Sequence, residues 1–302
     1  MELPNNLVLS NGRLNDDYIL KKEILYKGIN GNLVERFYLS PTESYVFKQL
    51  AVGNGSQEVW VYENILPAFP PIYPELVAHE ANWVIFEDLG KLSHDFKEES
   101  VLGVIKLMAG WHSLPYENAP LTGLKPSFEK IIAEVRAKRL ELERLLPELN
   151  IDERLISNAY LLLESVEFSK KMVLSHGDLH IGNYCFHNNR LIVLDWEHTH
   201  INLPYWDLYH ILDMSHPLFP KKITSEFRWK VLNTYLDDIG IVVDRAAFIK
   251  EYYLFSTVFS MWMIMLIFED LHSDELKWPK EKLEDQLNES VLNLIQCGSF
   301  LL

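Results

Sequence analysis

The stretch from residue 175 to residue 195 reads SHGDLHIGNYCFHNNRLIVLD, and the interpretation of the whole chain starts from it. An apolar run before it predicts a short strand that leads into a polar loop. Asp178 lies in this loop, Asn183 follows five residues later, and a hairpin predicted around 187–190 leads to Asp195. An Asp or Asn alone in a loop is usually a turn former that bonds its own backbone. The combination of all three at this spacing favours a shared chemical role.

Phosphoryl transfer in protein kinases uses the same spacing. There an Asp accepts the proton of the acceptor hydroxyl, an Asn five residues on holds Mg²⁺, and an Asp after a hairpin holds the bridging metal. Mg²⁺ prefers oxygen ligands, and the reaction depends mostly on positioning and charge neutralisation. The pattern therefore predicts that Asp178 is the proton acceptor and that Asn183 and Asp195 are metal ligands.

A lysine in the N-terminal part supplies a matching element. Lys48 lies in YVFKQL, a run that predicts a strand, where an inward charge is costly unless it is paired. The helix predicted for 57–66 offers two partners, Glu58 and Glu63, and we favour Glu58. A strand lysine held by a helix glutamate is the arrangement that binds nucleotide phosphates. The alternative is that Lys48 is a solvent-facing strand residue.

The segment FEDLG at 86–90 follows a predicted strand and is a candidate for binding the base of a nucleotide. The backbone C=O and N–H groups of Glu87, Asp88 and Leu89 could bind the edge of an adenine, with Val84 and Leu89 on the faces of the ring. The same pattern also fits a plain turn.

Secondary-structure patterns divide the chain into two parts. Residues 1–88 read mostly as short strands with one helix, and they predict a small antiparallel sheet as an N-lobe. Residues 89–302 read mostly as helices, including 127–146, 151–171 and the segment from 207 to the end, and they predict a larger C-lobe. Strands followed by helices are typical of an α+β fold rather than of an alternating parallel one.

These motifs, in this order, resemble the aminoglycoside phosphotransferase and choline kinase superfamily, the small-molecule branch of the protein-kinase-like fold. The matching motifs cover about residues 18–215 and are YVFK with Lys48, EVWVYENIL with Glu58, VIFEDLG with Glu87 to Gly90, LMAGWHSL with His112, HGDLHIGN with Asp178 and Asn183, LIVLDWE with Asp195, and PYWDLYHIL with Asp207. The HGDLHIGN and LDWE motifs are the specific part, and the others corroborate them.

The resemblance implies a bilobal protein-kinase-like fold, ATP or GTP as the donor, Mg²⁺ as cofactor and a small hydroxylated acceptor. It also implies that Asp207 braces the catalytic loop. The chain departs from the stricter protein-kinase pattern because residues 28–31, GING, lack a G-x-G-x-x-G phosphate loop. The glycines of 53–55 read as a turn before the helix.

Two other classes of protein fit parts of the sequence. Histidines crowd the region from 176 to 200 and could form the zinc site of a metal hydrolase, but this leaves Lys48 and Glu58 unexplained. A kinase-like protein without activity, similar to spore-coat members of the superfamily, would have no reason to keep Lys48, Asp178, Asn183 and Asp195 together. Glu197 could contact metal or substrate, or only order its loop.

Composition limits the partners of the chain. Asp plus Glu number 43 against 28 Lys plus Arg, a net charge of −15 that argues against nucleic acid and anionic membranes. If acidic residues of the C-terminal part line the acceptor site, a cationic acceptor would be favoured; the candidates are Asp237, Asp238, Glu269, Asp270 and Asp274. The two cysteines and the absence of a secretory signal at the start predict a cytoplasmic protein.

The uncharged run at 252–268, YYLFSTVFSMWMIMLIF, admits two interpretations. A membrane span usually has about 20 apolar residues and basic flanks on one side. This run is shorter and is flanked by Glu251 and Glu269, so we favour the central buried helix of a helical lobe.

Overall fold

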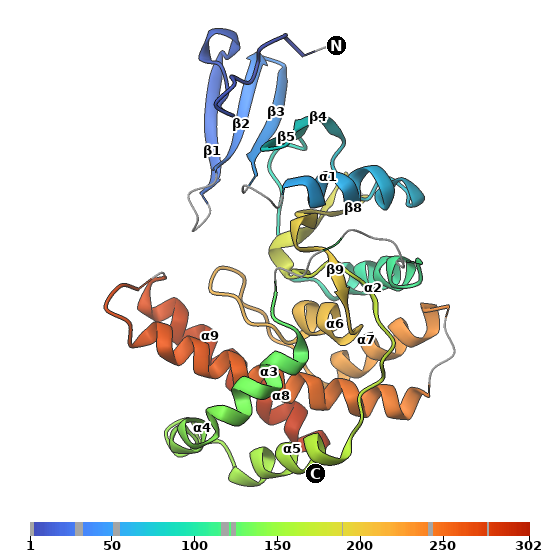
Figure 1. Cartoon of the computed structure of the whole chain (residues 1–302), viewed down its shortest axis with the longest axis vertical. Coiled ribbons are helices and arrows are strands. Elements are labelled where there is room, and N and C mark those ends of the chain that lie inside the picture. The colour runs from blue at the N-terminus through green and yellow to red at the C-terminus, as the bar shows by residue number, and fades with distance from the viewer. Residues whose placement is uncertain are drawn as a thin grey trace. The chain divides into compact units, whose positions relative to one another are not determined.

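The computed structural model describes residues 3–27, 33–50, 55–115, 121, 125–188, 190–240, 244–276 and 278–302 (Figure 1). Its contacts divide the chain into two compact units: unit 1 is Met1–Ser93 with Cys185–Thr199, and unit 2 is His94–Tyr184 with His200–Leu302. The domain boundary after residue 88 stays a prediction. The contacts thus group Cys185–Thr199, which contains Asp195, with the N-terminal part of the chain.

Unit 1 is built on an antiparallel sheet whose described strands run in the order β1-β2-β3-β5-β4 (Figure 1). The strands are β1 (Lys21–Lys27), β2 (Leu33–Ser40), β3 (Glu43–Gln49), β4 (Leu76–Glu80) and β5 (Trp83–Glu87). Side chains alternate between the two faces of a strand, and directly paired residues share a face. Lys48 of β3 pairs with Val34 of β2 and Val84 of β5, so these three residues lie on one face.

The opposite face of the sheet carries the apolar core of unit 1. Phe37, Phe47 and Ile85 are almost completely buried there, and Leu7 and Leu14 from the N-terminal segment pack against them. The aromatic and branched residues that favour strands thus also bury one face of the sheet. The face that carries Lys48 is covered in part as well, because Val84 and Phe86 are buried there.

One helix and one hairpin complete unit 1. The helix α1 (Gly55–Asn64) ends before the predicted residue 66, and the short 3-10 helix η2 (Leu66–Ala68), which contains Pro67, follows it. The strands β7 (Tyr184–His187) and β8 (Arg190–Val193) form the predicted hairpin, although Asn189 lies outside the described residues. The 3-10 helix η4 (Trp196–His198) then follows Asp195.

Unit 2 is mostly helical, as predicted (Figure 1). Its helices are α2 (Glu98–His112), α3 (Phe128–Ala137), α4 (Arg139–Leu145), α5 (Glu153–Ser165), α6 (Tyr205–Leu212), α7 (Ser225–Asp238), α8 (Arg245–Leu271) and α9 (Lys280–Phe300). The short strands β6 (Val173–Ser175) and β9 (His200–Asn202) pair antiparallel, and the 3-10 helix η3 (Ile181–Asn183) lies between them in sequence. The predicted strand before the polar loop is therefore present as β6.

Two predicted helices of unit 2 were wrong in extent. The segment 127–146 forms α3 and α4, separated at Lys138, whose φ of −95° and ψ of 16° are not helical. Neither Gly nor Pro marks this break, so the sequence carries no local signal for it. The helix predicted for 151–171 is α5, which starts after the capping side chain of Asp152 and ends where Val166 becomes extended.

The long apolar run lies in α8. By length and composition α8 is the one helix among the described residues that could cross a membrane, and 61% of its most apolar 18-residue window is buried inside the structure. The helix α8 contacts α9, α3, α5 and α6. Its aromatic side chains stack within this core, and the ring centroids of Phe255 and Phe128 lie 4.2 Å apart. The run therefore has the packing of a core helix, the interpretation we favoured.

A buried ionic cluster joins α6, α7 and α8. Asp213, fully buried after α6, accepts hydrogen bonds from Arg228 at 2.7 Å, Tyr252 at 2.6 Å and Ser256 at 2.8 Å. Burial opposes ionisation of Asp213, but Arg228 outweighs this and lowers the pKa of Asp213 below its ordinary value. A buried charge of this kind is tolerated only because its partners are present.

Replacing one member of this cluster tests its importance. We expect Asp213→Ala to lower the free energy of unfolding by about 3–5 kcal/mol, because Arg228 is then buried without its counter-charge. Urea denaturation followed by circular dichroism measures the change. The control is Asp237→Ala, whose exposed pair with Arg245 is worth about 0–1 kcal/mol. Equal effects of the two variants would contradict the analysis.

Candidate functional site

The ammonium group of Lys48 is the centre of a charged cluster in unit 1. Its Nζ atom lies 2.8 Å from Oε2 of Glu58, 2.5 Å from Oδ1 of Asp195 and 3.0 Å from Oε2 of Glu197. Strand β3 supplies the lysine, α1 supplies Glu58, and the segment after β8 supplies the other two carboxylates. Glu63, the rival partner, instead lies 3.3 Å from His79. The favoured pairing with Glu58 is thus the one in the structure.

The cluster carries more negative than positive charge. Burial disfavours the charged form of Lys48, but Asp195, Glu58 and Glu197 outweigh it and hold the pKa of Lys48 well above its ordinary value. Burial raises the pKa of Glu58 to about 7; Lys48 opposes this rise and the charge of Asp195 adds to it. Asp195 and Glu197 add two carboxylates to a lysine that is already paired with Glu58, so the cluster favours a further cation.

This donor set fits a divalent metal ion. Glu58, Asp195 and Glu197 offer oxygen atoms that all lie within 4.8 Å of one another. Oxygen donors at this density are the ligands that Mg²⁺ takes. Asp195 and Glu197 are about one-third exposed, whereas Glu58 is almost fully buried and committed to Lys48. The carboxylates of Asp195 and Glu197 are therefore better metal ligands than that of Glu58.

The backbone at Asp195 is unusual. Asp195 has φ of 62° and ψ of 62°, the left-handed region that side chains other than glycine seldom adopt. The following turn is tied to α1, because the side-chain amide of the buried Gln57 donates to the carbonyls of Glu197, at 3.1 Å, and Thr199. The sequence analysis missed Gln57, since a glutamine beside Glu58 has no signature of its own. Strained backbone held by such contacts is frequent at functional sites.

The connector at 87–90 is also ordered by side chains of unit 1. The carboxylate of Asp88 accepts hydrogen bonds from Arg36 Nε at 2.7 Å, Ser44 Oγ at 2.7 Å and the backbone N–H of Gly90 at 2.8 Å. Burial raises the pKa of Asp88, but these donors outweigh it and lower the pKa below its ordinary value. The side chain of Asp88 thus has a structural task, and only the backbone of Glu87 to Leu89 remains for the predicted nucleotide contact.

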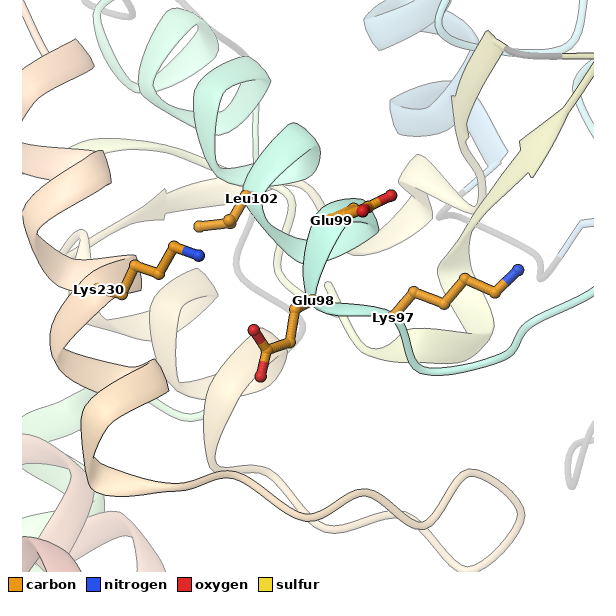
Figure 2. A pocket seen from close by; sticks show the side chains of 5 residues that line it. All are labelled: Lys97, Glu98, Glu99, Leu102 and Lys230. Atoms are coloured by element: carbon orange, nitrogen blue, oxygen red, sulfur yellow. The ribbon is translucent and has the colours of Figure 1, made fainter.

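Two surface hollows occur away from the charged cluster. One in unit 1, of about 590 Å³, has the paired side chains of Glu87 and Arg190 in its lining, 3.5 Å apart. One in unit 2, of about 460 Å³, is lined by Lys97, Glu98, Glu99, Leu102 and Lys230 (Figure 2). In Figure 2 the side chain of Lys230, on α7, extends toward Leu102, whereas that of Lys97, the residue before α2, extends away from both, so the two ammonium groups do not converge on one ligand. Val84, predicted to face the adenine, is fully buried.

The loop that contains Asp178 is the candidate site of unit 2, and Asp207 holds it in place. The fully buried carboxylate of Asp207 accepts hydrogen bonds from Ser175 Oγ at 2.7 Å and from the backbone N–H groups of His176 at 2.7 Å and Gly177 at 3.0 Å. It also lies 3.1 Å from Nε2 of His112. The bracing role that the resemblance implied for Asp207 is therefore present as geometry. Gly177 has φ of 86°, which explains why a glycine precedes Asp178.

Asn183 lies at the end of the same loop. Its side-chain nitrogen donates to the carbonyl of Asp178 at 2.8 Å, so its amide oxygen is the atom left to bind a cation. The geometry relates Asn183 to Asp178 within unit 2. Its predicted partnership with Asp195, which belongs to unit 1, stays a prediction.

Among the residues that the structure describes, a lysine and two histidines lie near the carboxylate of Asp178. Its Oδ1 lies 3.2 Å from Nζ of Lys125 and 4.0 Å from Nε2 of His210, and its Oδ2 lies 3.7 Å from Nε2 of His180. Lys125 belongs to the segment before α3, far from Asp178 in sequence, and the sequence analysis missed it because no motif contains it. The histidines order the site by hydrogen bonding, as His180 does by accepting from the N–H of Gly182 at 3.0 Å.

The acidic residues that suggested a cationic acceptor lie at the surface. Asp237, Asp238, Glu269 and Asp274 are exposed and Asp270 is half-buried. Asp237 pairs with Arg245, and Glu269 pairs with Lys138. The expectation of a cationic acceptor receives no support from them. The GING segment of residues 28–31 and residues 53 and 54 lie outside the described residues.

Comparison with known proteins identifies the family. A model of the phosphotransferase enzyme family matches residues 78–241, more than half of the chain. The chain therefore belongs to this family, as its resemblance to the aminoglycoside phosphotransferase and choline kinase superfamily implied. No curated protein sequence matches the chain significantly.

Solved structures show the same fold at low identity. A choline kinase from Cryptosporidium parvum is 17% identical with a TM-score of 0.57, covering 97% of this chain and 96% of that one. A choline/ethanolamine kinase family protein from Mesorhizobium loti is 11% identical with a TM-score of 0.61, covering 94% and 93%. The AMP-bound spectinomycin phosphotransferase is 13% identical with a TM-score of 0.59, covering 91% and 93%. The α+β protein-kinase-like fold predicted from the sequence is confirmed.

The buried carboxylate of Asp207 predicts a pH dependence of stability. Burial alone would raise its pKa, but His112 and the other donors hold the pKa well below the ordinary value. A depressed pKa stabilises the fold above the unfolded-state pKa of about 4 and loses that contribution as the pH falls below it. We therefore expect Asp207→Asn to have a lower free energy of unfolding than wild type at pH 6. The difference in the free energy of unfolding between the two should narrow below about pH 4.

Urea denaturation at a series of pH values measures this margin. The control is Asp244→Asn, because Asp244 is an exposed cap of α8 and Asn caps a helix equally well. A margin between wild type and Asp207→Asn that is independent of pH would show that the ionised carboxylate is not what braces the loop.

Proposed function

We propose that the chain is a small-molecule kinase that transfers the γ-phosphoryl group of ATP or GTP, with Mg²⁺, to a hydroxyl group of a small acceptor. Membership of the phosphotransferase family supports the class of reaction. The observation that carries the proposal is Lys48 held 2.8 Å from Glu58 and 2.5 Å from Asp195, the arrangement that binds nucleotide phosphates beside a metal ion. Similar solved structures include a spectinomycin phosphotransferase with AMP and one with ADP and spectinomycin.

Each residue has a proposed task. Lys48, oriented by Glu58, binds the nucleotide phosphates, and the backbone of Glu87, Asp88 and Leu89 binds the base. Asn183 and Asp195 hold Mg²⁺, with Glu197 as a further carboxylate at the same cluster. The metal ion, when bound, supplies neutralisation of the charge on the phosphate oxygens.

Asp178 is the proposed proton acceptor. The acceptor oxygen forms a bond to the γ-phosphorus while the bond from that phosphorus to the bridging oxygen of ADP breaks, and the electron pair of that bond leaves with ADP. The hydroxyl proton passes to a carboxylate oxygen of Asp178. The hydrogen bonds that Asp207 accepts keep the backbone before Asp178 in place during the reaction.

The partners and location follow from composition. We propose that the chain acts in the cytoplasm without nucleic acid or membrane partners, on the support of its net charge of −15 and its two free, buried cysteines.

Replacing Asp178 tests the reaction. We expect Asp178→Asn to lower kcat about 10²–10⁴-fold for any acceptor that the wild type uses, with the affinity for ATP-Mg²⁺ unchanged, because Asn has the same shape but cannot take the proton. The assay follows ADP release with choline, ethanolamine, spectinomycin and simple sugars, and calorimetry measures ATP binding. Wild type that neither turns over nor binds ATP with Mg²⁺ would instead indicate a non-catalytic kinase-like protein.

Replacing Lys48 tests the phosphate contact separately. We expect Lys48→Met to raise the KM for ATP at least tenfold, because the ammonium that holds the phosphates is lost. Initial rates of ADP release at varied ATP concentrations give the KM. The matched control is Lys130→Met on the exposed side of α3. An unchanged KM in Lys48→Met would remove Lys48 from the nucleotide site.

A further inference from the structure

The inference concerns Lys125, whose ammonium group lies beside the proposed proton acceptor. Nζ of Lys125 is 3.2 Å from Oδ1 of Asp178, and the lysine side chain is 28% exposed while that of Asp178 is 15% exposed. A hydroxyl group that donates to Asp178 must come within about 3 Å of one of its oxygens. The atoms next to that hydroxyl then lie within a few ångströms of a permanent positive charge.

The two imidazoles near Asp178 do not change this charge balance. His210 donates from Nδ1 to the carbonyl of Trp206 at 2.8 Å, and burial lowers its pKa to about 4, so it is neutral at physiological pH. Nδ1 of His180 accepts the N–H of Gly182 at 3.0 Å, and its Nε2 faces the side-chain nitrogen of Asn183 at 3.4 Å, so both ring nitrogens lie against hydrogen-bond donors. Lys125 is therefore the charged neighbour among the contacts described for Asp178.

Aromatic rings continue outward from His180, one of the neighbours of Asp178. His180 stacks on His216 with centroids 4.6 Å apart and lies 5.8 Å from Phe219, and Trp278 follows 6.1 Å from His216. Burial is the main cause that lowers the pKa of His216 to about 3, so this ring is neutral at physiological pH. A half-buried row of neutral rings offers apolar contact to an acceptor without attracting a particular charge.

We propose that Lys125 sets the charge of the acceptor: the small molecule phosphorylated at Asp178 is neutral or anionic near its reacting hydroxyl, and a cation there is rejected. This inference rests on the proposed function. It separates the chain in substrate class from the choline and ethanolamine kinases whose fold it shares.

The physical basis is the Coulomb interaction between two positive groups in a partly buried site. With an effective dielectric constant between those of a protein surface and water, two unit charges about 5–6 Å apart repel enough to change affinity about tenfold. The carboxylate of Asp178, 3.2 Å away, offsets this repulsion while it is ionised, but the offset is lost as Asp178 takes the hydroxyl proton, so the repulsion appears in kcat/KM. A neutral molecule of the same shape experiences no such penalty.

The experiment compares acceptors that differ in charge alone. Choline is the cationic probe, and its isostere in which a tert-butyl group replaces the trimethylammonium group is the neutral one. ADP release from ATP-Mg²⁺ gives kcat/KM for each, in wild type and in Lys125→Met, with Lys130→Met as the matched control. We expect wild type and the control to prefer the neutral probe about tenfold, and Lys125→Met to use both about equally.

The outcomes separate this inference from the proposed function. If the wild type uses choline as well as or better than the neutral probe, the role of Lys125 is overturned while the kinase function stands. The same holds if the wild type phosphorylates another acceptor of the assay but neither probe. A preference for the neutral probe that survives in Lys125→Met would also overturn it. Wild type without any Mg²⁺-dependent turnover of ATP would remove the function and this inference together. A Lys125→Glu variant that prefers choline would support the assignment independently of apolar packing.

Discussion

The contact on which unit 1 depends is the one between the ammonium group of Lys48 and its three carboxylates. The side chain of Lys48 is only 14% exposed, so its charge is stable only with counter-charges. These come from two other places in the sequence: Glu58 on α1, and Asp195 with Glu197 after β8. Glu58 fixes α1 against the sheet, while Asp195 and Glu197 fix the segment after the β8 strand. The ion pairs of Lys48 thus join the sheet, α1 and the segment after β8.

The neighbour of Glu58 strengthens this assembly. Gln57 donates from its amide to the carbonyls of Glu197 and Thr199, so α1 binds the Asp195 segment through a neutral contact as well as through Lys48. The strained backbone of Asp195 is held from both sides. A carboxylate that is held in this way needs no rearrangement to receive a cation, which is the advantage of preorganisation in a site that works by charge neutralisation.

Unit 2 uses a buried carboxylate for the same purpose. Asp207 binds the loop before Asp178 through two backbone N–H groups and Ser175, and His112 supports it from α2. Asp213 does the equivalent work between the helices, where Arg228 is its partner. The loop is thus positioned by buried residues that belong to helices, and the exposed surface of unit 2 can vary without displacing Asp178.

The sequence by itself determined the class of fold, the order of the elements and the residues of the motifs, and it favoured Glu58 over Glu63 as the partner of Lys48 without deciding between them. These follow from spacing, because residues a few positions apart on a strand, a helix or a turn have little freedom relative to one another. Only the tertiary structure decided that the long helix breaks at Lys138, that Gln57 holds the Asp195 segment, and that Lys125 lies beside Asp178. The contacts of Gln57 and Lys125 join segments far apart in the chain, and the break at Lys138 has no Gly or Pro to mark it. Their energies come from packing and charge in three dimensions, for which local sequence carries no signal.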